Sequence, residues 1–246
     1  MTLLPKNEPH KTIDIPRNFF IYGKTMSGKS YLAERFPNPV FLNTDGNSLA
    51  NKAPSIQLKN ERNENGTLKI SIIDQLDEIM LELQTMNKKP GYGFETVVVD
   101  VIDDVATMIE QAVALENNVK TLADVPYGKG FAAFNSVLQG LVMELKALPM
   151  NVIYISRIDE RQNDSGETIE VPSLKVKYYN VVNGNCDLVI HTKKIGTRYV
   201  RSITDKRKDY FASRINDPKI LNILKAIPGA IQPEPQTQNT ENKVGK

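Results

Sequence analysis

One short stretch near the N-terminus constrains this chain more than any other part of it. Residues 18–31 read NFFIYGKTMSGKSY, in which Gly23 and Gly28 enclose four residues and Lys29 and Ser30 follow. This spacing is the P-loop pattern, in which backbone N–H groups turn inward around phosphate groups. The pattern requires a strand before the loop and a helix after it, and the flanking residues are typical of both. The sequence therefore predicts a phosphate-binding loop.

The loop also assigns chemical roles. Lys29 is expected to reach the β- and γ-phosphates of ATP, and Ser30 is expected to hold Mg²⁺ through its hydroxyl group. ATP and Mg²⁺ are therefore the expected cofactors. The residues expected to contact the nucleotide are Gly23, Lys24, Thr25, Met26, Ser27, Gly28, Lys29, Ser30 and Tyr31.

Short apolar runs alternate with helical patterns over the first two thirds of the chain, which predicts an α/β fold of the P-loop NTPase class. The sheet is expected to be mainly parallel, with helices on both faces. Strands are predicted at 18–22, 40–43, 96–100 and 151–156, and an antiparallel hairpin at 187–192 and 197–203. Helices are predicted from Lys29 to before Pro37, at 72–86, around 105–113, at about 131–148 and at 218–227, with loops at 116–130 and 157–177.

Composition divides the chain into three parts: an N-terminal arm (1–17), an ATPase core (18–227) and a tail (228–246) predicted to be disordered. Residues 1–156 carry 15 basic and 18 acidic side chains, whereas residues 157–228 carry 14 and 9. The second part is thus more suited to a polyanion. The one cysteine, Cys186, suits a reducing cytoplasm, and no run is long enough to cross a membrane.

Acidic residues follow two of the predicted strands. Asp100 ends the run TVVVD and is expected to support the metal together with Ser30. Asp103 and Asp104 come next, and helix N-capping is favoured for them over metal binding. Asp45 follows the strand VFLN, where it could orient the attacking water. An ordinary Asp-Gly turn is the alternative for Asp45.

Arg157 completes the predicted catalytic set of Lys29, Asp45, Asp100 and Arg157. It follows the strand NVIYIS, where a polar side chain can sense the γ-phosphate, although an exposed loop arginine explains it equally well. Residues 193–214 hold eight basic and two acidic side chains. Among these, Lys206, Arg207 and Lys208 are candidates to complete a neighbouring subunit's site in trans, and a solvated hairpin face is the alternative.

The two predicted loops at 116–130 and 157–177 combine basic and aromatic residues. This combination suits single-stranded DNA, because charge binds the backbone and rings stack on bases. Lids over the nucleotide are the alternative. The candidate DNA contacts are Lys120, Tyr127, Lys129, Lys175 and Lys177.

In this order the motifs resemble the RecA-like ATPase core, and more narrowly the short phage RecA-like proteins described as single-strand annealing proteins or recombinases. The resemblance covers about residues 18–215 and rests on IYGKTMSGKS, FLNTD, TVVVD, YGKGF, NVIYISR and the basic hairpin. It implies ATP and Mg²⁺ binding at Lys29, Ser30 and Asp100. It also implies DNA contact by the two loops.

Two positions depart from the pattern of that family. Asp45 stands where a catalytic glutamate is usual, so efficient hydrolysis is in doubt. Arg157 stands where a glutamine sensor is common. Lys206 and Lys208 match the paired lysines that reach a neighbour's nucleotide.

The resemblance implies an ATP-dependent protein that binds single-stranded DNA and promotes annealing or strand exchange in phage recombination, inside the host cytoplasm. The expected partners are single-stranded DNA and further copies of the chain in a ring or filament, with a single-strand binding protein as another candidate and no membrane. Two alternatives stay open. One is a nucleotide-gated DNA-binding module or loader with little hydrolysis, and the other is a small-molecule P-loop kinase.

Overall fold

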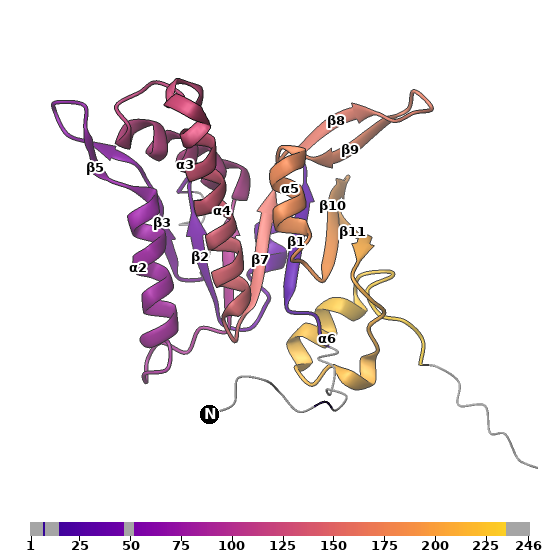
Figure 1. The fold of residues 1–246 in the computed structure, drawn as a ribbon. Helices are drawn as coiled ribbons and strands as arrows, with labels where there is room; N and C mark the ends of the chain where they lie inside the picture. The colour runs from indigo at the N-terminus through magenta and orange to yellow at the C-terminus, as the bar shows by residue number, and fades with distance from the viewer. Residues whose placement is uncertain (1–6, 8–14, 47–51, 235–246) are drawn as a thin grey trace, which may run out of the picture.

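The protein is built on one large sheet, seen in a computed structural model that describes residues 7, 15–46 and 52–234. Seven strands lie in the order β11-β10-β1-β7-β6-β2-β3 (Figure 1). All neighbouring pairs are parallel except β10 and β11, which form an antiparallel pair at one edge. The predicted fold class is therefore confirmed.

The sheet strands are β1 (Asn18–Gly23), β2 (Pro39–Asn43), β3 (Ser55–Gln57), β6 (Thr96–Asp100), β7 (Asn151–Ser156), β10 (Leu188–Ile195) and β11 (Arg198–Lys206). Two separate hairpins pair β4 (Glu61–Arg62) with β5 (Leu68–Ile70), and β8 (Ile158–Gln162) with β9 (Thr168–Pro172). The helices are α1 (Lys29–Ala33), α2 (Ile72–Thr85), α3 (Ile102–Glu116), α4 (Lys129–Ala147), α5 (Val176–Asn183) and α6 (Pro218–Lys225). Short 3-10 turns are η2 (Leu122–Asp124), η3 (Pro126–Gly128) and η4 (Ala212–Arg214).

Two apolar cores cover the two faces of the sheet. Side chains alternate along each strand, so Phe20 and Tyr22 of β1 join one core while Phe19 and Ile21 join the other. The first core packs against α2, α3, α4 and α5, which lie in front of the sheet in Figure 1. The second packs against α1 and α6. Because both faces are covered, the central strands read as nearly continuous apolar runs.

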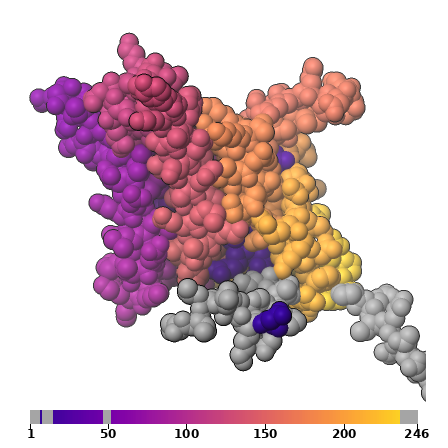
Figure 2. All heavy atoms as spheres, viewed as in Figure 1, coloured from indigo at the N-terminus to yellow at the C-terminus, as the bar shows by residue number. Residues whose placement is uncertain are grey.

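The segment 157–177 is not the loop that the sequence predicted. It forms the β8–β9 hairpin and then enters α5, and Figure 2 shows the hairpin standing clear of the rest of the molecule. Its strands pair only with each other and stay largely exposed, and β8 contains a single apolar residue, Ile158, so only β9 carries a short alternating pattern. Helix α5 reads VKYYNVVN, which is rich in β-branched and aromatic residues. Burial of Tyr178 and Val182 overrides this weak helix propensity.

The other predicted loop, at 116–130, is also partly structured. Two 3-10 turns, η2 and η3, fill it, and α4 begins at Lys129 rather than near Phe131. Thr121 and Asp124 form a capping box around η2, because the Asp124 carboxylate accepts hydrogen bonds from the backbone N–H and the hydroxyl of Thr121. This exchange fixes the shape of the segment.

Most of the predicted arm and tail lies outside the described residues, so both stay predictions. Ordered contacts nevertheless continue past the predicted boundary at 228. Ala230 is buried, and the N–H of Gln232 donates to the carbonyl of Tyr210 at 2.8 Å. Within the ranges that the structure covers, none of the helices is long and apolar enough to cross a membrane.

The packing of α4 gives a direct test of the first core. Leu138 is buried at the centre of this core, whereas Met143 on the same helix is 59% exposed. Leu138→Ala is expected to lower the free energy of unfolding by about 2 to 5 kcal/mol, because it leaves a cavity. Met143→Ala, the matched control, should change it by less than about 0.5 kcal/mol. Urea denaturation followed by circular dichroism measures both. Equal losses in the two variants would contradict this account of the core.

Candidate nucleotide-binding site

The carboxyl ends of the parallel strands meet at one edge of the sheet and form the site. The register pairs Tyr22 of β1 with Ser156 of β7, and Ile155 of β7 with Asp100 of β6. Strand β7 therefore lies between the strand that enters the P-loop and the strand that ends in Asp100. The loop, Asp100 and Ser156 are brought together by strand pairing alone.

The two P-loop glycines are required by the local geometry. A Cβ atom at Gly23 would lie 2.2 Å from the carbonyl oxygen of Thr192, so no larger residue fits there without moving β10. Gly28 has φ of 86°, in the left-handed region that glycine adopts at little cost. The hydroxyls of Ser27 and Thr192 hydrogen-bond at 2.7 Å. Strand β10 thus supports the loop from one side, a contact that sequence patterns did not predict.

Lys29 lies inside the loop. Its side-chain ammonium donates hydrogen bonds to the carbonyl oxygens of Gly23 at 2.8 Å and Lys24 at 2.9 Å, and the residue is only 8% exposed. Burial lowers the pKa of the Lys29 ammonium, because the charged form is poorly solvated there. A desolvated cation held in a ring of backbone groups is well suited to bind phosphate oxygens.

Ser30 and Asp100 form a second polar pair beside the loop. The Ser30 hydroxyl donates to a carboxylate oxygen of Asp100 at 2.7 Å. Burial raises the pKa of the Asp100 carboxyl, the Ser30 hydrogen bond opposes that shift, and the charge of Asp45 adds to it. A cation near this pair would relieve the cost of burying the carboxylate.

The Ser30–Asp100 pair is suited to Mg²⁺, which takes few of its ligands from protein, and not to a metal ion that is held by protein side chains alone. Within 15–46 and 52–234, no three His, Cys, Asp or Glu side chains lie close enough to hold a metal ion. Mg²⁺ is commonly bound through one or two protein oxygens, with phosphates and water as the other ligands. Ser30 and Asp100 are therefore the residues that would hold it.

The sequence predicted that Asp103 and Asp104 cap the N-terminus of α3, and this prediction is wrong. The cap position is Val101, and no side chain caps the helix there. Asp103 instead accepts hydrogen bonds from the hydroxyls of Ser156 at 3.0 Å and Ser173 at 2.6 Å. The helix begins close enough to the end of β7 that its first carboxylates reach across to that strand. They tie α3 to the edge of the site.

Arg157 is held by Asp104 through two parallel hydrogen bonds. The distances are 2.6 Å and 2.7 Å from the two guanidinium nitrogens to the two carboxylate oxygens. The hydrogen bonds to Asp104 raise the pKa of the Arg157 guanidinium, and the same contact lowers the pKa of the Asp104 carboxyl. Arg157 is thus ordered and near the site, as a sensor must be, but its charge faces Asp104.

Asp45 is exposed on the turn that follows β2. Its charge raises the pKa values of both Asp100 and Arg157, which places it at the same edge of the sheet. Gly46 adopts φ of 73° and donates its N–H to the Asn43 side chain. The water-orienting role and the Asp-Gly turn are therefore compatible with each other.

Of the remaining loop residues, Thr25 and Met26 lie at the exposed crest, where Met26 adopts φ of 63°. Lys24 forms ion pairs with Glu160 and Glu170 of the β8–β9 hairpin, each at 3.2 Å. Glu170 in turn contacts side chains of β10, with Lys193 at 2.8 Å. The hairpin is therefore tied to the P-loop itself, a link that the sequence did not reveal.

The candidate trans-acting residues lie near the amino ends of the parallel strands, whereas the P-loop lies at their carboxyl ends. Lys206 pairs with Leu188, at the start of β10. Each candidate has a partner in its own chain. Lys206 pairs with Asp209, and the Lys208 ammonium lies 5.7 Å from the centroid of the Tyr210 ring.

Arg207 is the most tightly held of the three candidates. It donates to the backbone carbonyls of Gly184 and Cys186 and pairs with Asp187. A finger in trans must be free to turn toward its neighbour, so Lys206 and Lys208 are better placed for that role than Arg207.

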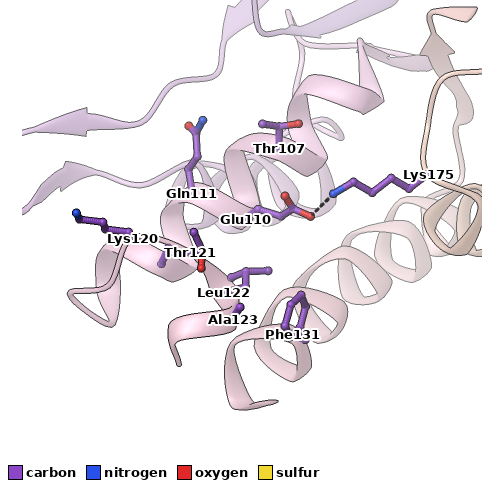
Figure 3. Close-up of a pocket in the computed structure, with 10 residues that line it drawn as sticks. Thr107, Glu110, Gln111, Lys120, Thr121, Leu122, Ala123, Phe131 and Lys175 are labelled. Carbon is purple, nitrogen blue, oxygen red and sulfur yellow. Dashed lines mark hydrogen bonds and ion pairs between the residues drawn. The ribbon is translucent and has the colours of Figure 1, made fainter. Parts of the chain in front are cut away.

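The candidate DNA residues are partly brought together in a groove of about 360 Å³. Figure 3 shows Lys120 and Lys175 at opposite ends of this groove, with Phe131 between them and Lys175 paired to Glu110. The other lining residues are Thr107, Gln111, Ala114, Thr121, Leu122 and Ala123. Residues from both predicted loops thus line one groove.

The other candidate DNA residues lie outside the groove lining. Tyr127 is 95% exposed, and Lys129 and Lys177 are exposed on the first turns of α4 and α5. Phe131, which the sequence did not single out, is exposed at the start of α4 and falls outside the apolar stripe of that helix. An aromatic residue outside the apolar stripe was the sequence feature that could have marked Phe131 as a surface residue.

One feature of 157–177 and one of the residue that follows it argue against DNA contact by the whole segment. Residues 158–172 carry five acidic side chains and one basic side chain, so the projecting hairpin repels a polyanion. Tyr178 is buried and its hydroxyl bonds to Glu110, which removes it from base stacking. Lys175 and Lys177 follow the hairpin and are not part of it.

Comparison with known proteins identifies a family for the chain. A family model described as an AAA domain matches residues 15–213. This span contains the P-loop, Asp100, Arg157 and the candidates at 206–208. No curated protein shows significant similarity to the chain.

The buried Asp100 carboxyl predicts a pH-dependent stability difference. Its folded-state pKa is raised, so it contributes stability that is present below its unfolded pKa of about 3.9 and lost as the pH rises through the folded value. Asp100→Asn removes this loss. Without nucleotide, the free energy of unfolding of Asp100→Asn relative to wild type should therefore increase from pH 4 to pH 8. A difference that is constant with pH, measured by urea denaturation, would contradict the raised pKa.

Arg157 gives a kinetic test. If its guanidinium turns to the γ-phosphate in the transition state, Arg157→Ala should lower kcat for ATP hydrolysis by about 100-fold, with KM changed by less than about threefold. Arg157→Lys keeps the charge but not the planar fork and is expected to fall between the two. Steady-state phosphate release measures all three proteins. A change in KM alone would show that Arg157 acts in binding and not in the chemical step.

Proposed function

The chain belongs to the AAA domain family of P-loop ATPases, and from this premise we propose that its nucleotide cycle controls single-stranded DNA. In this proposal the protein binds DNA in an ATP-dependent manner, assembles as a ring or filament of identical subunits, and promotes annealing or strand exchange in phage recombination. The family match itself extends only to the nucleotide-binding ATPase.

The observation that carries the proposal is the groove between Lys120 and Lys175. A single-strand site needs positive charge for the phosphates and an exposed ring for the bases. The groove has a lysine at each end and the half-exposed ring of Phe131 between them. The Gln111 amide on its wall can hydrogen-bond to base edges. These features favour a nucleic acid over an apolar small molecule.

Helix α3 connects this groove to the nucleotide site. Its first turn holds Asp103 and Asp104, which bind Ser156 and Arg157 at the sheet edge. About two turns later, Glu110 and Gln111 line the groove. A helix is stiff along its axis, so a shift of its first turn moves the groove wall. This provides a physical route from nucleotide to DNA.

In the nucleotide site, bound Mg²⁺ would neutralise charge that develops on the transferred phosphate oxygens. Lys29 contributes a fixed, desolvated cation at the centre of the loop. Ser30 and Asp100 supply the oxygen atoms that hold the metal. Asp45 is the carboxylate nearest to solvent and can accept a proton from an attacking water.

The position of the basic residues favours assembly over a monomeric lid. Lys206 and Lys208 lie at the end of the sheet remote from their own P-loop, which excludes a role at their own nucleotide and supports one at a neighbour's. Strand β11 pairs with β10 along its length, and β10 pairs with β1 over 188–192. A small-molecule kinase needs a lid that swings closed, and this paired hairpin is unsuited to that movement.

The second candidate function is a nucleotide-gated DNA-binding module with little hydrolysis. The exposure of Asp45 favours it, because a carboxylate on an open turn holds a water less firmly than a packed one. Phosphate release that is no faster with single-stranded DNA than without it, together with intact DNA binding, would support this candidate over the first.

The groove predicts a charge-reversal effect. Lys120→Glu with Lys175→Glu is expected to weaken binding to fluorescent oligo-dT by more than about tenfold in the presence of ATP and to reduce the slope of log K against log salt by about two. Lys88→Glu with Lys89→Glu is the matched control. It makes the same charge change on two exposed lysines in the turn before β6, at the amino ends of the parallel strands.

Fluorescence anisotropy measures both double variants over a salt series. Equal weakening in the two would show only a general charge effect. If wild type has no affinity for single-stranded DNA with or without ATP, the DNA part of the proposal is wrong.

A further inference from the structure

Two tyrosines face each other beside the P-loop. Tyr31 follows Ser30 on α1, and Tyr199 lies on β11, far away in the sequence. Their ring centroids are 6.3 Å apart and their planes differ by 28°. Both side chains are open to solvent, Tyr31 at 56% and Tyr199 at 46%. A nearly parallel, exposed aromatic pair next to a phosphate-binding loop is a suitable surface for a flat ring.

Tyr199 is held in a fixed position relative to the loop. A Cβ atom at Gly28 would come within 2.8 Å of its ring, so the ring packs directly on the P-loop backbone. Strand pairing opposite Lys194 sets the position of Tyr199 along the hairpin. Glycine at position 28 therefore serves two purposes, since it allows the left-handed turn and admits the ring.

Cationic side chains border the pair. The Lys194 ammonium lies 5.6 Å from the centroid of the Tyr199 ring. Arg201, two residues along the same strand, is half-buried and interacts electrostatically with Tyr31 and Arg35. Two cationic side chains therefore lie next to the tyrosine pair.

We propose that Tyr31 and Tyr199 bind the base of the nucleoside triphosphate held by the P-loop. A planar ring in contact with both tyrosines needs about 7 Å between their planes, twice a carbon contact distance of about 3.5 Å. The ring centroids are now 6.3 Å apart with the planes inclined at 28°, so a base binds between the rings only after they move apart and become parallel. A purine fits the pair best, because its larger ring system stacks over more of each tyrosine. The inference rests on nucleotide binding at the P-loop and not on the proposed DNA function.

The chain contains no tryptophan, which allows a direct optical test. Tyr199→Trp introduces a single indole at the tyrosine pair. Its emission is expected to be quenched in a saturable manner by ATP with Mg²⁺ and to be unaffected by tripolyphosphate with Mg²⁺. Tyr92→Trp is the matched control. Tyr92 is 45% exposed, but it lies in the turn before β6, at the amino ends of the parallel strands and away from the P-loop. Its emission should respond to neither ligand.

Affinity measurements complete the test. Tyr199→Ala should weaken ATP binding by about tenfold in calorimetry while leaving the affinity for tripolyphosphate unchanged, and Tyr199→Phe should keep both affinities. ATP binding that leaves the emission of the Tyr199→Trp variant unquenched, or equal loss of ATP and tripolyphosphate affinity in Tyr199→Ala, would overturn the inference. So would quenching by oligo-dT in place of ATP, which would assign the rings to a DNA base.

The two proposals can fail separately. Loss of oligo-dT binding leaves the inference about the tyrosine pair untouched. Conversely, a wild-type protein that binds neither ATP nor tripolyphosphate would refute nucleotide binding at the P-loop, and the inference about the tyrosine pair with it.

Discussion

Parallel pairing of β1, β7 and β6 is the constraint on which the site depends. In a parallel sheet all carboxyl ends lie at one edge, so the register that pairs Tyr22 with Ser156 and Ile155 with Asp100 gathers residues from distant parts of the chain. The apolar side chains of these strands are buried on both faces, which fixes the register. Packing of the two cores therefore sets the relative positions of the P-loop, Asp100 and Ser156 at the carboxyl ends of the strands.

Desolvation gives the site its electrostatic character. Burial lowers the pKa of Lys29 and raises that of Asp100, so each charge is held at a cost that a bound phosphate or metal can offset. Such stored cost is typical of binding sites and rare on ordinary surfaces. Beside them, the Arg157–Asp104 pair balances its own charges. Lys29 and Asp100 thus carry a desolvation cost that a ligand can offset, whereas Arg157 and Asp104 neutralise each other.

Contacts around the site run outward along three elements. Helix α3 links Asp104 to the groove lined by Lys120, the β8–β9 hairpin reaches the P-loop through Glu170, and β11 lays Tyr199 on Gly28. Each is a short chain of direct contacts. A change at the phosphate position therefore has three defined routes into the rest of the molecule.

The sequence by itself determined the P-loop, the buried central strands and the parallel fold class, because these depend on local spacing and on continuous apolar runs. It assigned Ser30 and Asp100 to the same metal, but their hydrogen bond depends on the sheet register. Only the tertiary structure decided that Asp103 and Asp104 bind across to the end of β7, that 158–172 is an acidic hairpin, that Phe131 lines a groove with Lys120, and that Tyr199 packs on Gly28. The physical reason is that hydrogen bonds and ring contacts between distant segments leave no periodic trace along the chain. They exist only once the sheet register has brought those segments together.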